Sequence, residues 1–131
     1  MPRYSSVSSL QYFQPLLTPF KLLTYLENPN PEGIAQSDAY GASVGIGPNH
    51  VAVGAPGEQD AAGVPSQGKV YLYTNTGTYL RTIDNPNPVA RVNAGDGDGF
   101  GISVAVNTGY VIVGAPGEND ATNNNGKAYV Y

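Results

Sequence analysis

Runs of alternating large apolar and small residues, separated by glycine, proline and asparagine, make up most of this chain. In residues 100–106, Phe100, Ile102, Val104 and Val106 alternate with glycine, serine and alanine. A period of two is the pattern of a β-strand, and small residues on one face suit close packing between two sheets. Short runs of this kind, bounded by turn residues, predict an all-β fold.

The same series of four strands is expected twice. We expect strands at residues 22–27, 40–46, 50–54 and 69–74 in the first unit, and at 79–84, 100–106, 110–114 and 127–131 in the second. Short connections predict hairpins between the second and third strands of each unit, and between residues 74 and 79. Residues 40–84 should therefore form a complete four-stranded antiparallel blade. Residues 100–131 should supply only three strands of another blade, and residues 22–27 should supply a strand without a partner.

Both units carry the same motif at nearly the same spacing. Residues 51–60 are Val-Ala-Val-Gly-Ala-Pro-Gly-Glu-Gln-Asp, and residues 111–120 are Val-Ile-Val-Gly-Ala-Pro-Gly-Glu-Asn-Asp. Further matches join Lys-Val-Tyr-Leu-Tyr at 69–73 to Lys-Ala-Tyr-Val-Tyr at 127–131, and Asn-Pro-Asn-Pro at 28–31 to the same four residues at 85–88. Self-similarity at a fixed period indicates a protein built from structural repeats.

This motif resembles the FG-GAP repeat, the blade unit of integrin-type β-propellers. Phe-Gly at residues 100–101 and Gly-Ala-Pro at 114–116 match both parts of that repeat. Tyr-Gly at 40–41 and Gly-Ala-Pro at 54–56 match it with one conservative change. The resemblance implies two four-stranded antiparallel propeller-type blades, and a binding or structural role rather than catalysis.

The resemblance covers repeat 1 at residues 22–78 and repeat 2 at residues 79–131, after an N-terminal extended arm at residues 1–21. We expect the arm to be an anchor, because an aromatic segment loses exposed apolar area by docking on a partner. The alternative is a partly ordered tail packed on its own domain. The residues expected to contact a partner are Leu10, Tyr12, Phe13, Leu16, Leu17 and Phe20 in the arm, and Leu23 and Tyr25 in the strand that follows.

Composition excludes several classes of function. The chain has 131 residues, a net charge of −4, 12% charged residues and no cysteine. Its six scattered Lys and Arg residues do not form the basic stripe that binding of nucleic acid requires. The absence of cysteine excludes disulfides and thiolate metal sites, and no apolar run approaches the ~20 residues of a membrane span. Prolines and polar residues also interrupt the apolar stretch that a signal peptide would need.

One loop resembles a calcium site. Residues 92–100 place the carboxylates of Asp96 and Asp98 at alternate positions, among glycines that permit tight turns. Calcium is usually bound by six or more oxygen atoms, however, and repeat 1 has Gln36 in place of Asp96. We therefore expect no cofactor, with calcium at Asp96 and Asp98 as the alternative. Without an ion, Asp38 and Asp98 would cap a turn by accepting hydrogen bonds from backbone amides.

The other polar residues of the motif do not indicate catalysis. Glu58 and Glu118 follow the Gly-Ala-Pro-Gly turn in both repeats, as do Asp60 and Asp120, and this recurrence indicates loop architecture rather than a unique site. The only histidine, His50, is a tyrosine in the second repeat. The serines of the second strands, at positions 43 and 103, have no histidine in register, so a nucleophile–base pair is not expected.

Four tyrosines alternate along the last strand of each repeat, at positions 71, 73, 129 and 131. Cross-strand aromatic packing accounts for them. The alternative is an exposed face of aromatic and asparagine residues that contacts a glycan or a cell-surface receptor.

These features together predict a non-enzymatic structural or adhesion module of a larger assembly. Within that class we expect a bacteriophage virion component, such as a tail fibre, spike or decoration protein, located in the virion. The absence of cysteine and of an export signal, the short arm and the surface-type repeat all agree with this hypothesis. The alternative is a secreted or cell-surface FG-GAP adhesion protein, extracellular and calcium-dependent.

The unpaired strand at residues 22–27 predicts that the chain binds other protein subunits. Two blades cannot close a propeller, since closed propellers have about four to eight blades. We expect a homo-oligomer in which residues 22–27 of one copy complete the second blade of its neighbour, and three copies would then give six blades. The alternatives are further repeats beyond Tyr131, docking of the arm, or an unrelated partner that caps the blade pair.

Overall fold

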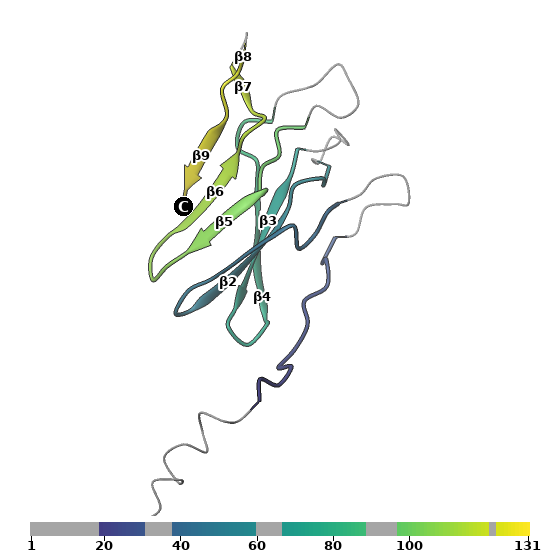
Figure 1. Ribbon diagram of the computed structural model, residues 1–131, viewed down its shortest axis with the longest axis vertical. Helices are drawn as coiled ribbons and strands as arrows, with labels where there is room; N and C mark the ends of the chain where they lie inside the picture. The colour runs from purple at the N-terminus through teal and green to yellow at the C-terminus, as the bar shows by residue number, and fades with distance from the viewer. Residues whose placement is uncertain (1–18, 31–37, 60–66, 89–96, 121–122) are drawn as a thin grey trace, which may run out of the picture.

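The computed structural model describes residues 19–30, 38–59, 67–88, 97–120 and 123–131. The regular elements in these ranges are all β-strands, arranged as two larger sheets and one small hairpin (Figure 1). Among the described residues, no helix is long and apolar enough to span a bilayer. The all-β prediction is therefore confirmed.

The first sheet contains the four strands predicted for the complete blade. They are β1 (Ser43–Ile46), β2 (His50–Ala55), β3 (Lys69–Thr74) and β4 (Tyr79–Asp84). Neighbours in the order β1-β2-β3-β4 are antiparallel, and the β3–β4 register places Lys69 opposite Asp84. The turn between β3 and β4 closes with Gly77 at φ 90°, a conformation that favours glycine.

The second sheet contains three strands, as predicted. They are β5 (Ser103–Val106), β6 (Val111–Ala115) and β9 (Lys127–Val130), in the order β5-β6-β9. Between β6 and β9, β7 (Asn119–Asp120) and β8 (Asn123–Asn124) form a short hairpin. Within the described residues β9 pairs only with β6, so its other edge is unpaired.

The strands β1 and β5 begin three residues later than predicted. A turn precedes each strand, in which Gly41 and Gly101 both have φ 89°. The Gly101 amide donates to the carbonyl of Gly114 at 3.0 Å, and the Ile102 amide donates back to Gly99 at 3.0 Å. This turn buries Phe100 and leaves Ile102 exposed, so the predicted common face of these two residues is wrong.

Residues 22–27 do not form the predicted strand. They pass along the outer face of the first sheet, which is the face that points away from the second sheet (Figure 1). A strand requires a neighbouring edge to pair with, and the segment lies over a sheet face rather than beside an edge. Its apolar side chains at positions 22, 23 and 25 are exposed, and only Leu26 packs on the sheet.

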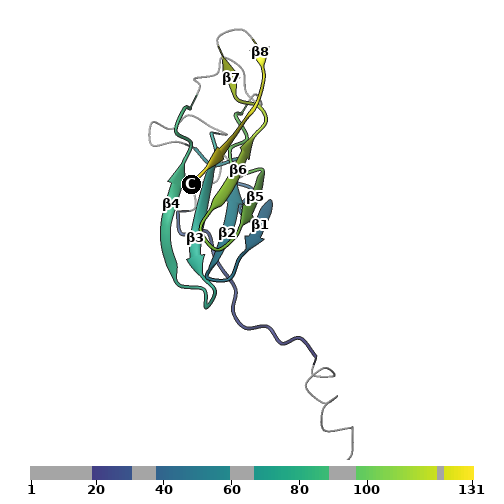
Figure 2. The same ribbon diagram turned by 90° about the vertical axis from the view of Figure 1, so that its left-hand side faces the viewer.

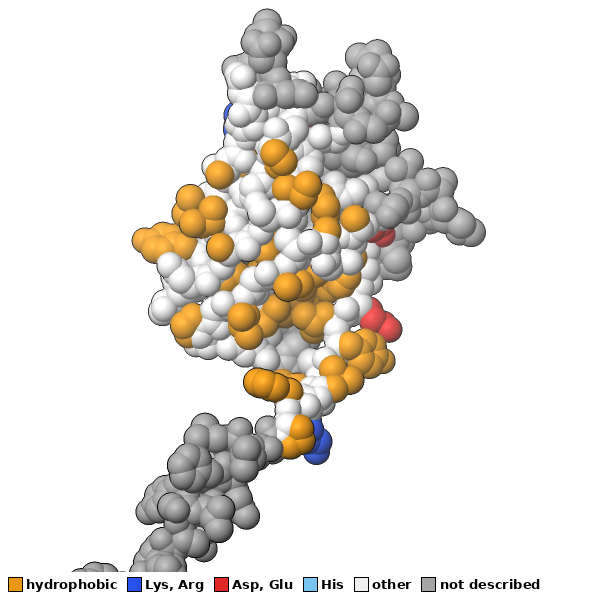
Figure 3. Space-filling view, viewed as in Figure 1, with side chains coloured by type: hydrophobic (Ala, Val, Ile, Leu, Met, Phe, Trp, Pro, Cys, Tyr) orange, Lys and Arg blue, Asp and Glu red, His pale blue; other side chains and the backbone are white. Residues whose placement is uncertain are grey.

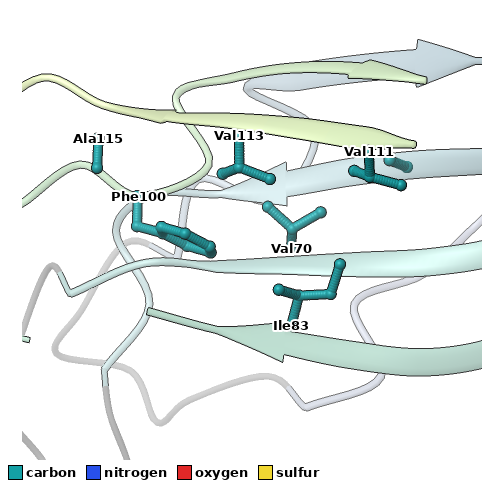
Figure 4. Packing of buried hydrophobic residues seen from close by; sticks show 7 residues of the cluster. Val70, Ile83, Phe100, Val111, Val113 and Ala115 are labelled. Atoms are coloured by element: carbon teal, nitrogen blue, oxygen red, sulfur yellow. The ribbon is translucent and has the colours of Figure 1, made fainter. Parts of the chain in front are cut away.

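The main core lies between the two larger sheets, whose strands run in nearly the same direction (Figure 2). Val70 and Ile83 of the first sheet point toward Phe100, Val111 and Val113 of the second (Figure 4). The sheets approach closely where the first sheet has glycine: a Cβ atom on Gly54 would lie 2.0 Å from the carbonyl oxygen of Gly101.

Small residues do permit the close packing, but of the three predicted in residues 100–106 only Gly101 lies at the contact. Gly45 and Gly54 lie at the junction of the two sheets. Ser103 and Ala105, the small residues of β5, are exposed on the far side of the second sheet.

A second cluster covers the outer face of the first sheet. It consists of Val53, Ala55, Tyr71 and Tyr73, with Leu26, Tyr40 and Val51 packed against them. Successive residues of β2 therefore point to different cores: Ala52 joins the core between the sheets, and Val53 joins the outer cluster. The outer face of the first sheet is therefore covered in part, at the cluster, whereas Val44 and Ile46 of β1 are exposed.

Candidate functional site

The acidic residue after the Gly-Ala-Pro-Gly turn is the centre of a buried polar network in both repeats. In repeat 2, the carboxylate of Glu118 is fully buried and accepts hydrogen bonds through Oε1 from Lys127 Nζ at 2.7 Å, Tyr129 Oη at 2.6 Å and Asn87 Nδ2 at 2.7 Å. The backbone carbonyl of Glu118 also accepts from the amide of Gly126 at 3.0 Å.

The network of repeat 1 is the same. Glu58 is fully buried, and its Oε1 accepts from Lys69 Nζ at 3.1 Å, from Asn30 Nδ2 at 3.1 Å and from the hydroxyl of Tyr71. The Gly68 amide donates to the Glu58 carbonyl at 2.9 Å. Because each donor in one repeat has a donor of the same type in the other, the network is a property of the repeat.

The hydrogen bonds determine the charge state of Glu118. Burial alone would raise the pKa of this carboxyl group, but the donors Lys127, Tyr129 and Asn87 outweigh burial and lower the pKa below its ordinary value. The phenol of Tyr129 shifts in the opposite sense: burial and its hydrogen bond to Glu118 raise its pKa. The pair is therefore an ionised carboxylate and a neutral phenol, and neither group has a pKa suited to proton transfer near neutral pH.

A second acidic residue of each repeat is held by an asparagine. The Asp98 Oδ2 atom accepts from Asn85 Nδ2 at 2.9 Å, and Asp38 Oδ2 accepts from Asn28 Nδ2 at 2.9 Å. The backbone carbonyl of Asp98 accepts from the Gly117 amide at 3.0 Å. Each of these carboxylates thus accepts a hydrogen bond from a side-chain amide, and the predicted hydrogen bonds from backbone amides stay a prediction.

The structure describes only one of the two predicted calcium ligands. Asp98 is fully buried, and Asp96 lies outside the described residues. Among the residues described, no group of three or more His, Asp or Glu side chains is placed to hold a metal. Calcium at Asp96 and Asp98 therefore stays a prediction.

The Asn-Pro-Asn-Pro motif has a role that sequence analysis missed. Asn85 and Asn87 follow β4 of the first sheet, and they bind Asp98 and Glu118 in the loops of the second sheet. Each motif therefore joins the segment that precedes it to the loops of the blade that comes next. The recurrence of the motif at nearly the same spacing was the available signal, because a repeated asparagine pair in a loop indicates repeated hydrogen bonds.

Ser43 and His50, which were considered for catalysis, lie apart in the structure: one joins the two sheets and the other lines a groove. The Ser43 hydroxyl donates to the Gly101 carbonyl at 2.6 Å and so joins the two sheets. His50 lines a groove of about 200 Å³ together with Leu72, Arg81, Tyr110 and Tyr131. No serine–histidine hydrogen bond occurs among the described residues.

The predicted cross-strand aromatic packing occurs between Tyr73 of β3 and Tyr79 of β4, whose rings lie 5.9 Å apart. The ring of Tyr40 lies 5.7 Å from that of Tyr71, and the ring of Phe100 lies 5.7 Å from that of Tyr129. Both pairs are tilted, and each lies within one of the two clusters. The two pairs occupy matching positions, one pair in each repeat. The tyrosines of β3 are buried, and their rings are therefore not available to a glycan.

The predicted partner contacts fall into two groups. Phe20, Leu23 and Tyr25 have strongly exposed side chains. The five predicted contacts in the arm proper lie outside the described residues; they are Leu10, Tyr12, Phe13, Leu16 and Leu17.

Comparison with known proteins gives one match. The sequence model of the FG-GAP repeat matches residues 31–73 and again residues 90–131. No curated protein and no solved structure matches the chain. The two matched segments contain both Gly-Ala-Pro turns and both buried glutamates.

Proposed function

The chain belongs to the FG-GAP repeat family, and from this premise we propose that it is a non-enzymatic structural and adhesion module of a larger assembly. FG-GAP repeats are adhesion-type modules, typical of extracellular or surface proteins. The proposal for this chain is that it acts by presenting sheet faces to other protein subunits.

One observation carries the proposal: three acidic residues of the repeat loops are buried, and several large apolar side chains are exposed. The carboxylates of Glu58, Asp98 and Glu118 are buried on donors of the same chain. Apolar side chains such as Ile46 and Val130 are exposed. In Figure 3 hydrophobic side chains spread over the visible face, whereas acidic ones appear only near one margin. Apolar surface of this kind supports protein binding.

Within this class we propose a virion component, such as a tail fibre, spike or decoration protein. A chain without cysteine folds without disulfides and so suits assembly in a reducing compartment. The exposed side chains of Phe20, Leu22 and Leu23 support docking of the N-terminal segment on another subunit. The second candidate is a secreted or cell-surface adhesion protein, which the typical location of the family favours.

Fractionation of the native source tests both candidates. An antibody raised against the folded protein would be used on purified particles, on the washed cell surface and on the medium. We expect the protein in the particles, in constant ratio to other subunits. Recovery from the cell surface would support the second candidate, and recovery as a free monomer in every fraction would contradict both.

A deletion tests the role of the arm. Removal of residues 1–21 should leave the repeats folded, because the described contacts of the cores begin at Leu26. The shortened protein should no longer enter the particle. Loss of the β-sheet signal in circular dichroism would instead show that the arm belongs to the core.

A further inference from the structure

The contact between the two sheets has a giving face and a receiving face. The giving face, on the first sheet, comprises Ser43, Gly45, Ala52, Gly54, Val70, Leu72 and Ile83. The receiving face, on the second sheet, comprises Phe100, Gly101, Val104, Val106, Val111, Val113 and Tyr129. Each of these residues has a counterpart, which is the residue at the matching position of the other repeat.

The counterparts of the giving face lie on the free face of the second sheet, except that of Ile83, which is Leu26. Ile112 and Val130 are the counterparts of Ala52 and Leu72, and their side chains are 45% and 64% exposed. Ser103 is the counterpart of Ser43 and is also exposed. The second sheet thus repeats a face that the first sheet uses to bind a blade.

The counterparts of the receiving face lie on the outer face of the first sheet. Val44 and Ile46 are the counterparts of Val104 and Val106, and they are 69% and 73% exposed. Val104 and Val106 pack against the first sheet, where Val106 touches the position of Gly45. One end of the chain therefore offers a giving face, and the other end offers a receiving face.

Residues 24–30 already occupy part of the receiving face, in the place that β4 takes on the second sheet. Leu26 packs on the outer cluster as its counterpart Ile83 packs on the core between the sheets. Asn28 and Asn30 bind Asp38 and Glu58 as Asn85 and Asn87 bind Asp98 and Glu118. The segment is placed like the last strand of a preceding blade whose other three strands do not occur among the described residues.

We infer that a second copy of this chain supplies those three strands. The free face of its second sheet covers the outer face of the first sheet, and its β9 pairs antiparallel with residues 22–27. This inference deepens the proposed function, on which it rests, by naming the partner of the exposed faces. The contact between copies continues the contact between the sheets of one copy.

The β3–β4 pairing supplies the register. Lys69 lies opposite Asp84 and Val70 lies opposite Ile83, so Lys127 of one copy lies opposite Glu27 of the next, and Ala128 lies opposite Leu26. The side chain of Lys127, which is 42% exposed, then lies opposite an acidic residue, which gives the pairing charge complementarity. The hydroxyl of Ser103 is placed to donate to the Gly41 carbonyl of the next copy, as Ser43 donates to Gly101.

The two faces are different surfaces, so the contact is head-to-tail. A head-to-tail contact closes into a ring or continues as a fibre, and a two-fold symmetric dimer cannot satisfy it. Closed propellers have about four to eight blades, which corresponds to two to four copies of this chain.

Two variants, each altered at one end, test the inference by native mass spectrometry. V130D places a charge on the giving face, and I46D places one on the receiving face; both positions are exposed in the single copy, so both variants should fold. We expect the 131-residue protein to form oligomers, each variant to be monomeric, and an equal mixture of the two variants to give a one-to-one heterodimer. T76D, in the exposed β3–β4 turn, is the matched control and should still form oligomers.

A monomeric parent protein with a normal circular dichroism spectrum would overturn the inference. So would a mixture of the two variants that remains monomeric, because only a head-to-tail contact allows one intact end to bind the other. Neither result would contradict the proposed function if fractionation still finds the protein in particles, since a different subunit would then cover the faces.

Discussion

The same glutamate network occurs twice in this molecule, once inside it and once at its surface. Around Glu58 the side chain of Lys69 is 11% exposed, whereas around Glu118 the side chain of Lys127 is 42% exposed. Tyr71 is buried, and its counterpart Tyr129 is only half-buried. The donors and acceptors are of the same kinds, so the difference comes from what lies next to each repeat. One such difference is the neighbouring strand: Lys69 lies opposite Asp84 of β4, whereas the edge of β9 beyond Lys127 is unpaired among the described residues.

The largest expected effect tests this comparison at a pair of glycines. A Cβ atom on Gly54 would lie 2.0 Å from the backbone oxygen of Gly101 in the other sheet. On Gly114 its nearest neighbour would be Ser103 Oγ, and that side chain can rotate away. We expect G54A to lower the free energy of unfolding by ~3 kcal/mol or more, since core overpacking against backbone is costly. G114A should cost less than about 1 kcal/mol.

Urea denaturation of dilute protein measures both values. Under the head-to-tail contact, Gly114 packs on the next copy as Gly54 packs on the second sheet, so G114A should also reduce oligomer formation. Equal destabilisation by the two variants would show that the second repeat is packed as tightly as the first.

The next effect concerns the two glutamates. E58A leaves Lys69 as a buried charge without its acceptor, and such a loss typically costs about 3–5 kcal/mol. E118A leaves Lys127, which water can reach, so we expect a loss of about 1–3 kcal/mol. Thermal unfolding of both variants checks this order. A larger loss for E118A would contradict the view that the surroundings of each lysine determine the contribution of each network.

A smaller effect is expected with pH. The pKa of Glu118 is lower in the folded protein than its ordinary value of 4.5, so the unfolded state binds a proton more readily. The resulting stability is present above pH 4.5 and is lost as pH falls through the folded pKa. The free energy of unfolding of E118Q, measured by urea denaturation from pH 7 to pH 3, should therefore approach that of the parent protein as pH falls. A constant difference between the two proteins would contradict the shift.

The smallest expected effect is that of removing calcium. We expect excess EDTA to leave the melting temperature unchanged. A bound ion would stabilise the fold by about 2.7 kcal/mol at a hundredfold excess over its dissociation constant. A fall of several degrees, abolished in D96N, would establish the calcium site and make the second repeat unlike the first, which has Gln36 at the matching position.

Strand existence and pairing were predictable from sequence because alternation, turn residues and loop lengths are local. The ranges of β3 and β4 agree with prediction. Strand β1 does not begin at Tyr40, because the turn at Gly41 depends on a hydrogen bond to Gly54 across the sheet. Residues 22–27 have strand-like sequence, but a strand also requires a partner edge. Sequence pattern does not contain that information.

The candidate site was less predictable than the fold. Recurrence indicated that Glu58 and Glu118 are structural, and the structure gives both of them buried networks. The asparagine clasps could not be placed from sequence, because they join the end of one blade to loops of the next. The sequence also could not predict which apolar residues remain exposed. Leu72 and Val130 occupy matching strand positions, and only Leu72 has a second sheet over it.

The offset between repeat and blade has a consequence for gene duplication. In the predicted division between residues 78 and 79, strand β4 belongs to repeat 2, whereas by pairing it belongs to the first sheet. A duplicated repeat therefore brings a strand that pairs with the blade before it. It also brings the asparagines that form hydrogen bonds with the blade after it. Arrays of such units can gain or lose whole repeats, and every new contact between blades is then of the same kind as the existing ones. A cut at residue 78, within the β3–β4 hairpin, would by contrast divide a blade in two.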